Sequence, residues 1–228
     1  MLSCCLLAGC SWLNPKPDEF VQLNSAQSRQ MLKQISTETN GMRVVKCRGD
    51  ITLTVMKDNE PDVKKADLLY LWLPGKALRV RVKYFNVTVL SVLYDGTRWY
   101  LADDMNNTVS VCSRVDRVIS ETIPHAFFVQ LQQLPDGWIT RMHDNSTVYV
   151  SEFARRVETK TDQFTQVLIF PTGSALPSEA YLKMKDGSEL STYFNAPITN
   201  LAINPAMFTP RFDGYEIRYL DKQSAAGQ

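Results

Sequence analysis

The sequence predicts an α+β protein built on one large, curled antiparallel sheet, and three observations support this fold class. Runs with alternating apolar and polar side chains recur at short intervals, as in ALRVRVKY at 77–84. Turn signals such as Asp95-Gly96 separate these runs. No stretch alternates strands with crossover helices, which argues against a parallel α/β sheet. A single sheet of this length must curl, so we expect it to enclose apolar side chains or a cavity.

The elements follow in order along the chain. A helix is predicted from Asp18 to Gly41, because Phe20, Leu23, Gln27, Met31, Leu32 and Ile35 return near a 3.6-residue period. A second helical region, 116–134, is broken by Pro124 and closed by Pro135-Asp136-Gly137. Strands are predicted at 50–56, 77–84, 87–94, 97–103, 108–115, 146–153, 162–170, 179–185 and 189–194.

Composition limits the classes of function. The 228 residues are 44% hydrophobic and 21% charged, which is enough to bury a sizeable core. The formal net charge is +1, so no global field indicates nucleic acid, an acidic polymer or an anionic membrane as a partner. Arg79, Arg81 and Lys83 share one strand face; we interpret them as a solvated outer face in preference to an anion-binding stripe.

The N-terminus has the pattern of a bacterial secretory signal. Leu7-Ala8-Gly9-Cys10 resembles the lipobox of bacterial lipoproteins, and the Pro-containing segment Asn14 to Pro17 follows it. No Lys or Arg precedes Cys10, although a signal normally carries a basic n-region, so an apolar N-terminus with a thiol is the alternative. We predict a signal peptide at 1–9, a lipidated Cys10 with its tether at 10–19, a single domain at 20–220 and a frayed tail at 221–228.

The longer runs LLYLWLPGKALRVRV, VLYDGTRWYLADDMNNTVSV and EAYLKMKDGSELSTYFNAPITNLAINPAMF resemble the LolA/LolB lipoprotein-carrier superfamily. The resemblance covers most of 42–208 and implies an incomplete, half-open antiparallel β-barrel. It also implies helices over the concave face and a cavity for acyl chains of lipids or lipoproteins. Two departures are evident. Leu73 precedes Pro74, where LolA-type carriers tend to have a basic residue, and the turn at Tyr84-Phe85-Asn86 is short where the LolB type has a protruding apolar loop.

A ligand site for acyl chains requires apolar side chains without fixed charge, because each buried CH₂ gains about 0.8 kcal/mol. Strand parity and the 116–134 region predict the lining. A filled core would give the same alternation, so plain core residues are the alternative. The predicted lining is Leu53, Val55, Tyr70, Trp72, Leu78, Val80, Val82, Trp99, Leu101, Phe127 and Phe128.

Residues for catalysis or metal binding are sparse. The two histidines, His125 and His143, have no accompanying nucleophile in a recognisable context, and no phosphate-binding glycine motif occurs. Asp103-Asp104 is interpreted as part of a turn in preference to a metal site. We therefore expect no enzymatic activity, no cofactor and no metal.

Cys47 and Cys112 stand in strand-like runs, where a small buried thiol is favoured over a disulfide between them.

These observations together predict a monomeric, membrane-anchored envelope lipoprotein, placed by its N-terminal lipid on the periplasmic face of the outer membrane. Its expected ligands are acyl chains of lipids or lipoproteins, with a role in lipoprotein transport, and nucleic acid is not an expected partner. The alternative is a structural or regulatory envelope lipoprotein of the same fold, with a closed core, that acts through protein contacts.

Overall fold

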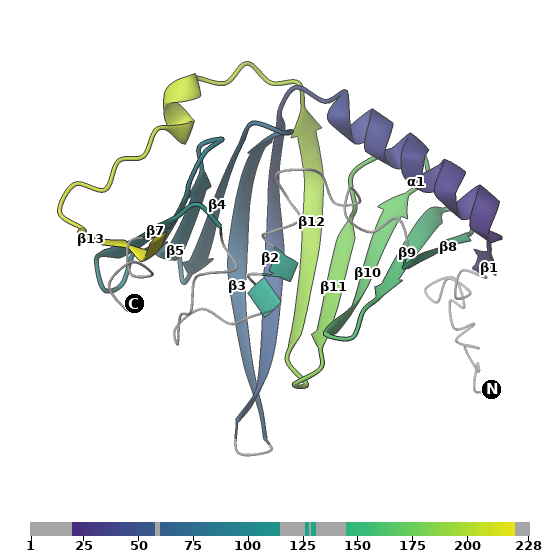
Figure 1. Ribbon diagram of the computed structural model, residues 1–228, viewed down its shortest axis with the longest axis horizontal. Coiled ribbons are helices and arrows are strands. Elements are labelled where there is room, and N and C mark those ends of the chain that lie inside the picture. Colours follow the sequence, from purple (N-terminus) through teal and green to yellow (C-terminus); the bar gives the residue numbers. More distant parts are fainter. Residues whose placement is uncertain (1–19, 58–59, 115–125, 128, 131–144, 222–228) are drawn as a thin grey trace, which may run out of the picture.

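A single 13-stranded sheet dominates the computed structural model, which describes residues 20–57, 60–114, 126–127, 129–130 and 145–221 (Figure 1). The strands are ordered β1-β8-β9-β10-β11-β12-β2-β3-β4-β5-β6-β7-β13, and the sheet is not closed into a barrel. Every pairing is antiparallel except that of β13 with β7. The bounds are β1 Val21–Gln22, β2 Val45–Lys57, β3 Glu60–Leu73, β4 Ala77–Tyr84, β5 Val87–Tyr94, β6 Trp99–Asp103, β7 Thr108–Cys112, β8 Ser146–Val150, β9 Ala154–Lys160, β10 Phe164–Pro171, β11 Glu179–Met184, β12 Glu189–Thr199 and β13 Glu216–Tyr219.

The N-terminal helix α1 spans Ser25–Asn40 and begins later than the periodicity predicts. The Asn24 side chain accepts hydrogen bonds from the backbone N–H groups of Ala26 and Gln27, and the Gln27 side chain accepts from the backbone N–H of Asn24. This capping box fixes the first turn at Ser25. The predicted start at Asp18 is wrong, because Val21–Gln22 pairs with β8 as a short strand instead.

One face of the sheet, here called the inner face, carries the core. Val148 and Val157 of β8 and β9 belong to the same buried cluster as Trp99 and Leu101 of β6, although many strands separate them in the sheet order. The core thus runs along one face from β8 to β6, and the predicted large antiparallel sheet is confirmed. Both Cys47 and Cys112 are buried thiols in it, and no disulfide joins them.

Helices contact the inner face in two described places. Leu32 and Ile35 of α1 are fully buried in the inner-face cluster. Ala126, Phe127, Val129 and Gln130 are helical, and Ala126 and Phe127 join the same cluster. Most of the helical region predicted at 116–134 lies outside the described residues. The prediction that several helices cover the concave face is therefore not confirmed.

The opposite, outer face is crossed by residues 200–221, which we call the C-terminal strap (Figure 1). It contains the 3₁₀ helix η3, Pro205–Phe208, and ends in β13. Phe208 is buried with Leu71 and Leu93 of β3 and β5, and Phe212 stacks on Tyr100 of β6 with ring centroids 5.8 Å apart. The outer face of β3–β7 is therefore apolar beneath the strap, an arrangement that the sequence did not predict.

Two predicted turns have the expected chemistry. Gly96 has φ of 98°, and Asp95 Oδ1 accepts hydrogen bonds from the backbone N–H groups of Thr97 and Arg98, which closes the β5–β6 hairpin. Asp103 does the same for Met105 and Asn106 at the end of β6. The interpretation of Asp103 as a turn residue is thus confirmed.

Candidate functional site: a hollow at the open end of the inner face

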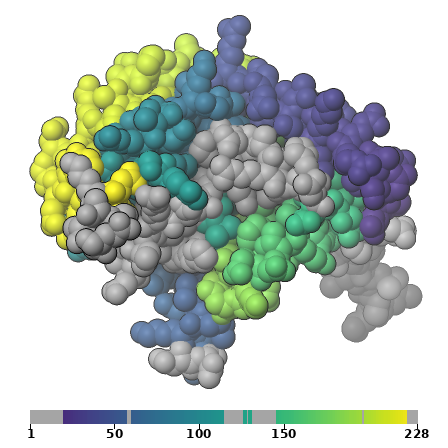
Figure 2. All heavy atoms as spheres, viewed as in Figure 1, coloured from purple at the N-terminus to yellow at the C-terminus, as the bar shows by residue number. Residues whose placement is uncertain are grey.

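A hollow of about 1790 Å³ lies at the end of the sheet farther from α1. The β2–β3 hairpin, the β4–β5 turn and the β11–β12 turn surround it. The hairpin projects beyond the body of the molecule (Figure 2). Side chains from both faces of the hairpin border the hollow, so the volume describes an open region and not an enclosed chamber.

The part of the hollow that faces the inner side is apolar. Register places Leu53 opposite Leu190 of β12, and Ile51 opposite Ala66 of β3. These aliphatic side chains form a continuous floor across three strands, because paired residues of neighbouring strands point to the same face. The remaining apolar lining of this side is Val55, Val82, Leu90 and Phe127.

The predicted lining residues divide into two groups. Leu53, Val55, Val82 and Phe127 border the hollow. The deeper residues are buried in the packed cluster between the hollow and α1, and their exposures are at most 6%: Tyr70, Trp72, Leu78, Val80, Trp99 and Leu101. Phe128 and the predicted anchor Cys10 lie outside the described residues. A ligand role for all of these residues stays a prediction.

Exposed apolar side chains mark the rim of the hollow. Phe85 is 83% exposed, and its φ of 47° is unusual for a bulky side chain. The Tyr84 ring packs edge-on against it with centroids 4.5 Å apart, and Met105 of the adjacent β6–β7 turn is 65% exposed. The short turn at 84–86 therefore presents an aromatic pair to solvent beside the opening.

Charged side chains border the hollow, and two of them belong to the inner side of the β2–β3 hairpin. Lys64 lies opposite Leu53, and Asp62 lies opposite Val55, so parity puts both on the inner side of the hairpin. Their Nζ and Oδ2 atoms are 3.4 Å apart, and both side chains are well exposed. Sequence reasoning missed these two residues, although continuing the two-residue period of Tyr70 down β3 would have found them. The apolar floor thus ends in an ion pair.

Three polar groups lie deep in the packed cluster. Burial raises the pKa of the Cys47 thiol to about 11, although a hydrogen bond with the Asn195 backbone opposes the shift. Burial also raises the pKa of Tyr70 well above its ordinary value, with a smaller contribution from Cys47. Among the described residues, neither the Tyr70 hydroxyl nor Trp72 Nε1 has a hydrogen-bond partner. Cys47 is therefore protonated at neutral pH and unsuited to act as a nucleophile.

The helical residues 126–127 and 129–130 are attached to the floor by a buried polar contact. Gln130 Nε2 donates to Thr192 Oγ1 of β12 over 3.3 Å, and both side chains are buried. Phe127 on the same segment borders the hollow. This contact fixes an aromatic side chain at the inner boundary of the opening.

A buried cation beneath α1 was also missed by sequence reasoning. Arg155 of β9 is 8% exposed and donates to the Ser174 carbonyl and to the Met31 sulfur. Burial lowers the pKa of its guanidinium, and Glu38 partly offsets this. The hollow does not border Arg155, so its charge belongs to the packing of α1 on the sheet.

The described residues contain no cluster of three or more His, Cys, Asp or Glu side chains that could hold a metal ion. His125 and His143 lie outside the described residues, as does any chemistry that they could support. Within the same described ranges, no helix has the length and apolarity needed to cross a bilayer.

Comparison with known proteins gave structural neighbours only. No family model and no curated protein matches the chain. A structure titled as a putative outer membrane lipoprotein-sorting protein domain from Vibrio parahaemolyticus is similar over 82% of this chain and 97% of that one, with 9% identity and a TM-score of 0.47. A LolA superfamily protein from Nitrosomonas europaea is similar over 80% and 98%, with 9% identity and a TM-score of 0.42. The lipoprotein LppX of Mycobacterium tuberculosis covers 78% and 98%, with 11% identity and a TM-score of 0.41.

A member of the LolA superfamily, which the sequence resembles, is thus among the structural neighbours. Identities near 10% and TM-scores below 0.5 carry no argument about activity.

Proposed function

We propose that this chain is a membrane-tethered, non-enzymatic envelope lipoprotein that binds an acyl chain of a lipid or lipoprotein in the hollow. The observation that carries the proposal is an aliphatic floor, centred on Leu53 and Leu190, next to an open volume of about 1790 Å³. Each methylene buried against such a floor gains about 0.8 kcal/mol, so a long acyl chain has a large driving force for entry.

The arrangement of charge supports the same ligand class. The Lys64–Asp62 pair stands at the open end of the aliphatic floor. Other charged residues also border the hollow, and among them Asp50, Lys65 and Asp67 point to the outer side. A ligand with an apolar tail and a polar head can place its tail on the floor and leave its head near these charges in water. The exposed Phe85 and Met105 at the rim add apolar surface along the path of entry.

A direct test is mass spectrometry of the purified chain under native conditions, followed by organic extraction. We expect acyl-containing lipid to accompany the protein. The rival function, an envelope lipoprotein with a closed core that acts through protein contacts, predicts a ligand-free protein in the same measurement.

A matched pair of variants locates the ligand. Val55 borders the hollow and points to the inner face, while its neighbour Thr54 points to the outer face. We expect Val55→Lys to weaken binding of a fluorescent fatty acid by on the order of 10-fold or more, because the tail would meet a charge. Thr54→Lys should change the affinity less than about twofold. Equal effects of the two variants would contradict a site on the inner face.

The proposed tether is tested separately. We expect Cys10→Ala to release the chain from the membrane fraction of the producing cells without altering its thermal denaturation. A variant that still sediments with membranes would argue against lipidation of Cys10 as the anchor.

A further inference from the structure

The outer face carries a local cluster of basic residues, although the net charge of the whole chain is near neutral. Lys46 and Arg48 of β2 and Arg79 and Arg81 of β4 point to this face, and Leu71 and Leu69 of β3 lie between them. In cross-strand order the rows read Lys46–Leu71–Arg79 and Arg48–Leu69–Arg81. No acidic residue stands in either row, although the next row on this face reads Asp50–Asp67–Lys83. The four cations are called the β2–β4 cation patch below.

No cation of this patch forms an ion pair with a carboxylate within the described residues. Within the part of the chain that the structure describes, the side chains of Lys46, Arg48 and Arg81 form no hydrogen bond or ion pair, and Arg79 donates only to the Met207 carbonyl of the strap, over 2.7 Å. The pKa of Arg79 is lowered by burial and by the nearby charge of Arg81, and the nearby charge of Asp104 partly offsets this. Three cations elsewhere on the described surface, Lys160, Lys183 and Arg218, each contact a carboxylate.

Exposed apolar side chains border the same patch. Ile198 of β12 lies directly opposite Lys46 and is 53% exposed. Met207, whose carbonyl receives the Arg79 hydrogen bond, is 45% exposed, and Leu201 at the start of the strap is 37% exposed. Cations flanked by exposed aliphatic side chains suit a surface that offers both anionic groups and an apolar layer.

We propose that the β2–β4 cation patch, with Ile198, Leu201 and Met207 beside it, docks against an anionic phospholipid surface. The cations stand on two strands, β2 and β4, with the leucines of β3 between them, so they do not converge on a single carboxylate or phosphate. They instead match a planar array of separate lipid phosphates, while the neighbouring aliphatic side chains reach the acyl boundary. The patch lies on the face opposite the apolar floor, so this contact is independent of acyl-chain binding in the hollow.

The test uses the full chain with Cys10→Ser, so that no lipid anchor can form. Co-sedimentation is measured with vesicles of phosphatidylglycerol and phosphatidylcholine, and with vesicles of phosphatidylcholine alone. The patch variant is Lys46→Gln, Arg48→Gln and Arg81→Gln. The control variant, Lys160→Gln, Lys183→Gln and Arg218→Gln, removes the same charge elsewhere. Arg79 is left intact because it binds the strap.

We expect binding to the phosphatidylglycerol vesicles that weakens as NaCl is raised from about 0.05 to 0.5 M, because salt screens exposed charges. Each basic residue at an anionic membrane contributes about a fivefold change in partitioning, so the patch variant should bind on the order of 10- to 100-fold more weakly. The control variant should stay within about threefold of the parent.

Three results would overturn the proposal: no binding beyond that to phosphatidylcholine, equal loss in both variants, or binding to polyglutamate with none to the anionic vesicles. The last result would assign the patch to an acidic protein. Fluorescent fatty-acid binding, measured on the same variants, should be unchanged. Failure of acyl-chain binding in all variants would therefore reject the proposed function without affecting the patch.

Discussion

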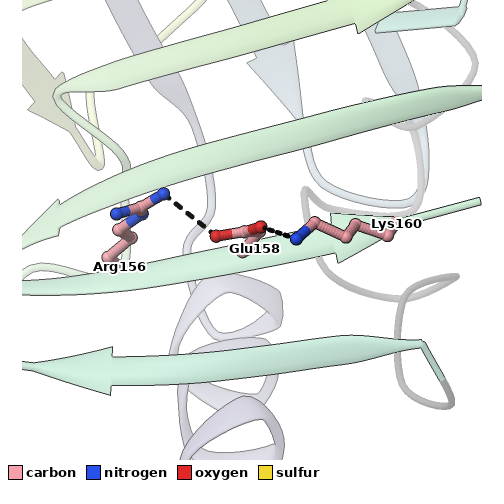
Figure 3. Close-up of polar contacts among 3 residues, drawn as sticks. All are labelled: Arg156, Glu158 and Lys160. Carbon is pink, nitrogen blue, oxygen red and sulfur yellow. Dashed lines mark hydrogen bonds and ion pairs between the residues drawn. The ribbon is translucent and has the colours of Figure 1, made fainter. Parts of the chain in front are cut away.

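The outer faces of the two halves of the sheet have different surroundings: solvent in one half and the C-terminal strap in the other. On β9–β11 the outer face meets water, and Glu158 lies between Arg156 and Lys160 with N–O distances of 2.9 and 2.7 Å (Figure 3). On β3, β5, β6 and β7 the outer face has apolar side chains that the C-terminal strap covers through Phe208 and Phe212, whereas β4 points Arg79 and Arg81 outward. One continuous sheet can therefore have a solvated outer side in one half and a second small core in the other.

The largest effect is expected where β2 and β12 join the two halves. A Cβ atom on Gly49 would lie 2.1 Å from the Tyr193 carbonyl oxygen, which is backbone and cannot move aside cheaply. We expect Gly49→Ala to lower the free energy of unfolding by about 3 kcal/mol or more, measured by urea denaturation. Gly41→Ala is the control, because its Cβ would meet only ordinary contacts at 3.4 and 3.6 Å. A change below 1 kcal/mol for Gly49→Ala would contradict the register there.

Next in size is the loss of the strap's main contact. Phe208 is 7% exposed and packs with Leu71 and Leu93. Phe208→Ala should therefore destabilise the protein by about 3 kcal/mol, because it leaves a cavity under the strap. Met207→Ala, at a neighbouring exposed position, should cost less than about 1 kcal/mol. Similar melting temperatures for the two variants would mean that the strap does not protect the outer face of β3–β7.

A smaller effect is expected from the polar contact at the far end of the strap. The Tyr215 hydroxyl donates to Asp104 Oδ1 over 2.6 Å, and Ser91 donates to the other oxygen of the same carboxylate. This hydrogen bond raises the pKa of Tyr215. Tyr215→Phe should cost about 1–2 kcal/mol, since a bond to a charged acceptor is lost. The exposed Tyr84→Phe serves as the control and should be neutral in the same thermal denaturation.

The smallest effect belongs to the solvated half. Glu158→Gln removes the negative charge that pairs with both Arg156 and Lys160, yet we expect a loss of only about 1 kcal/mol because solvent screens these pairs. The loss should shrink further in 0.5 M NaCl. A cost as large as that of Phe208→Ala would show that the two outer faces are stabilised in equivalent ways.

Strand parity predicted much of the sheet from sequence. The cross-strand register places Val80 beside Tyr70, and Leu101 beside Val92, on the same face, as their alternation indicates. The predicted hairpin at Asp95-Gly96 was also correct. These features depend on local patterns, and the pleat converts each pattern directly into a face.

The missed elements are those whose side chains are polar on both faces or whose partners are distant in sequence. β9 was not predicted, because Arg155 faces inward and Arg156 and Glu158 face outward, which leaves no apolar alternation to detect. The strap was missed because the residues that Phe208 and Tyr215 contact lie about a hundred residues earlier in the sequence. The hollow could not be predicted for a related reason. Leu53 and Val80 follow the same alternation, yet one borders open space and the other is packed.

Both borders of the sheet are occupied by segments from near the ends of the described chain. β1 is two residues long and pairs with β8, and β13 pairs with β7 in the one parallel contact. Without them, β8 and β7 would each present a row of open amide and carbonyl groups to another molecule. The terminal segments therefore limit edge-to-edge strand pairing between copies of the chain. Truncation of either segment is expected to promote aggregation.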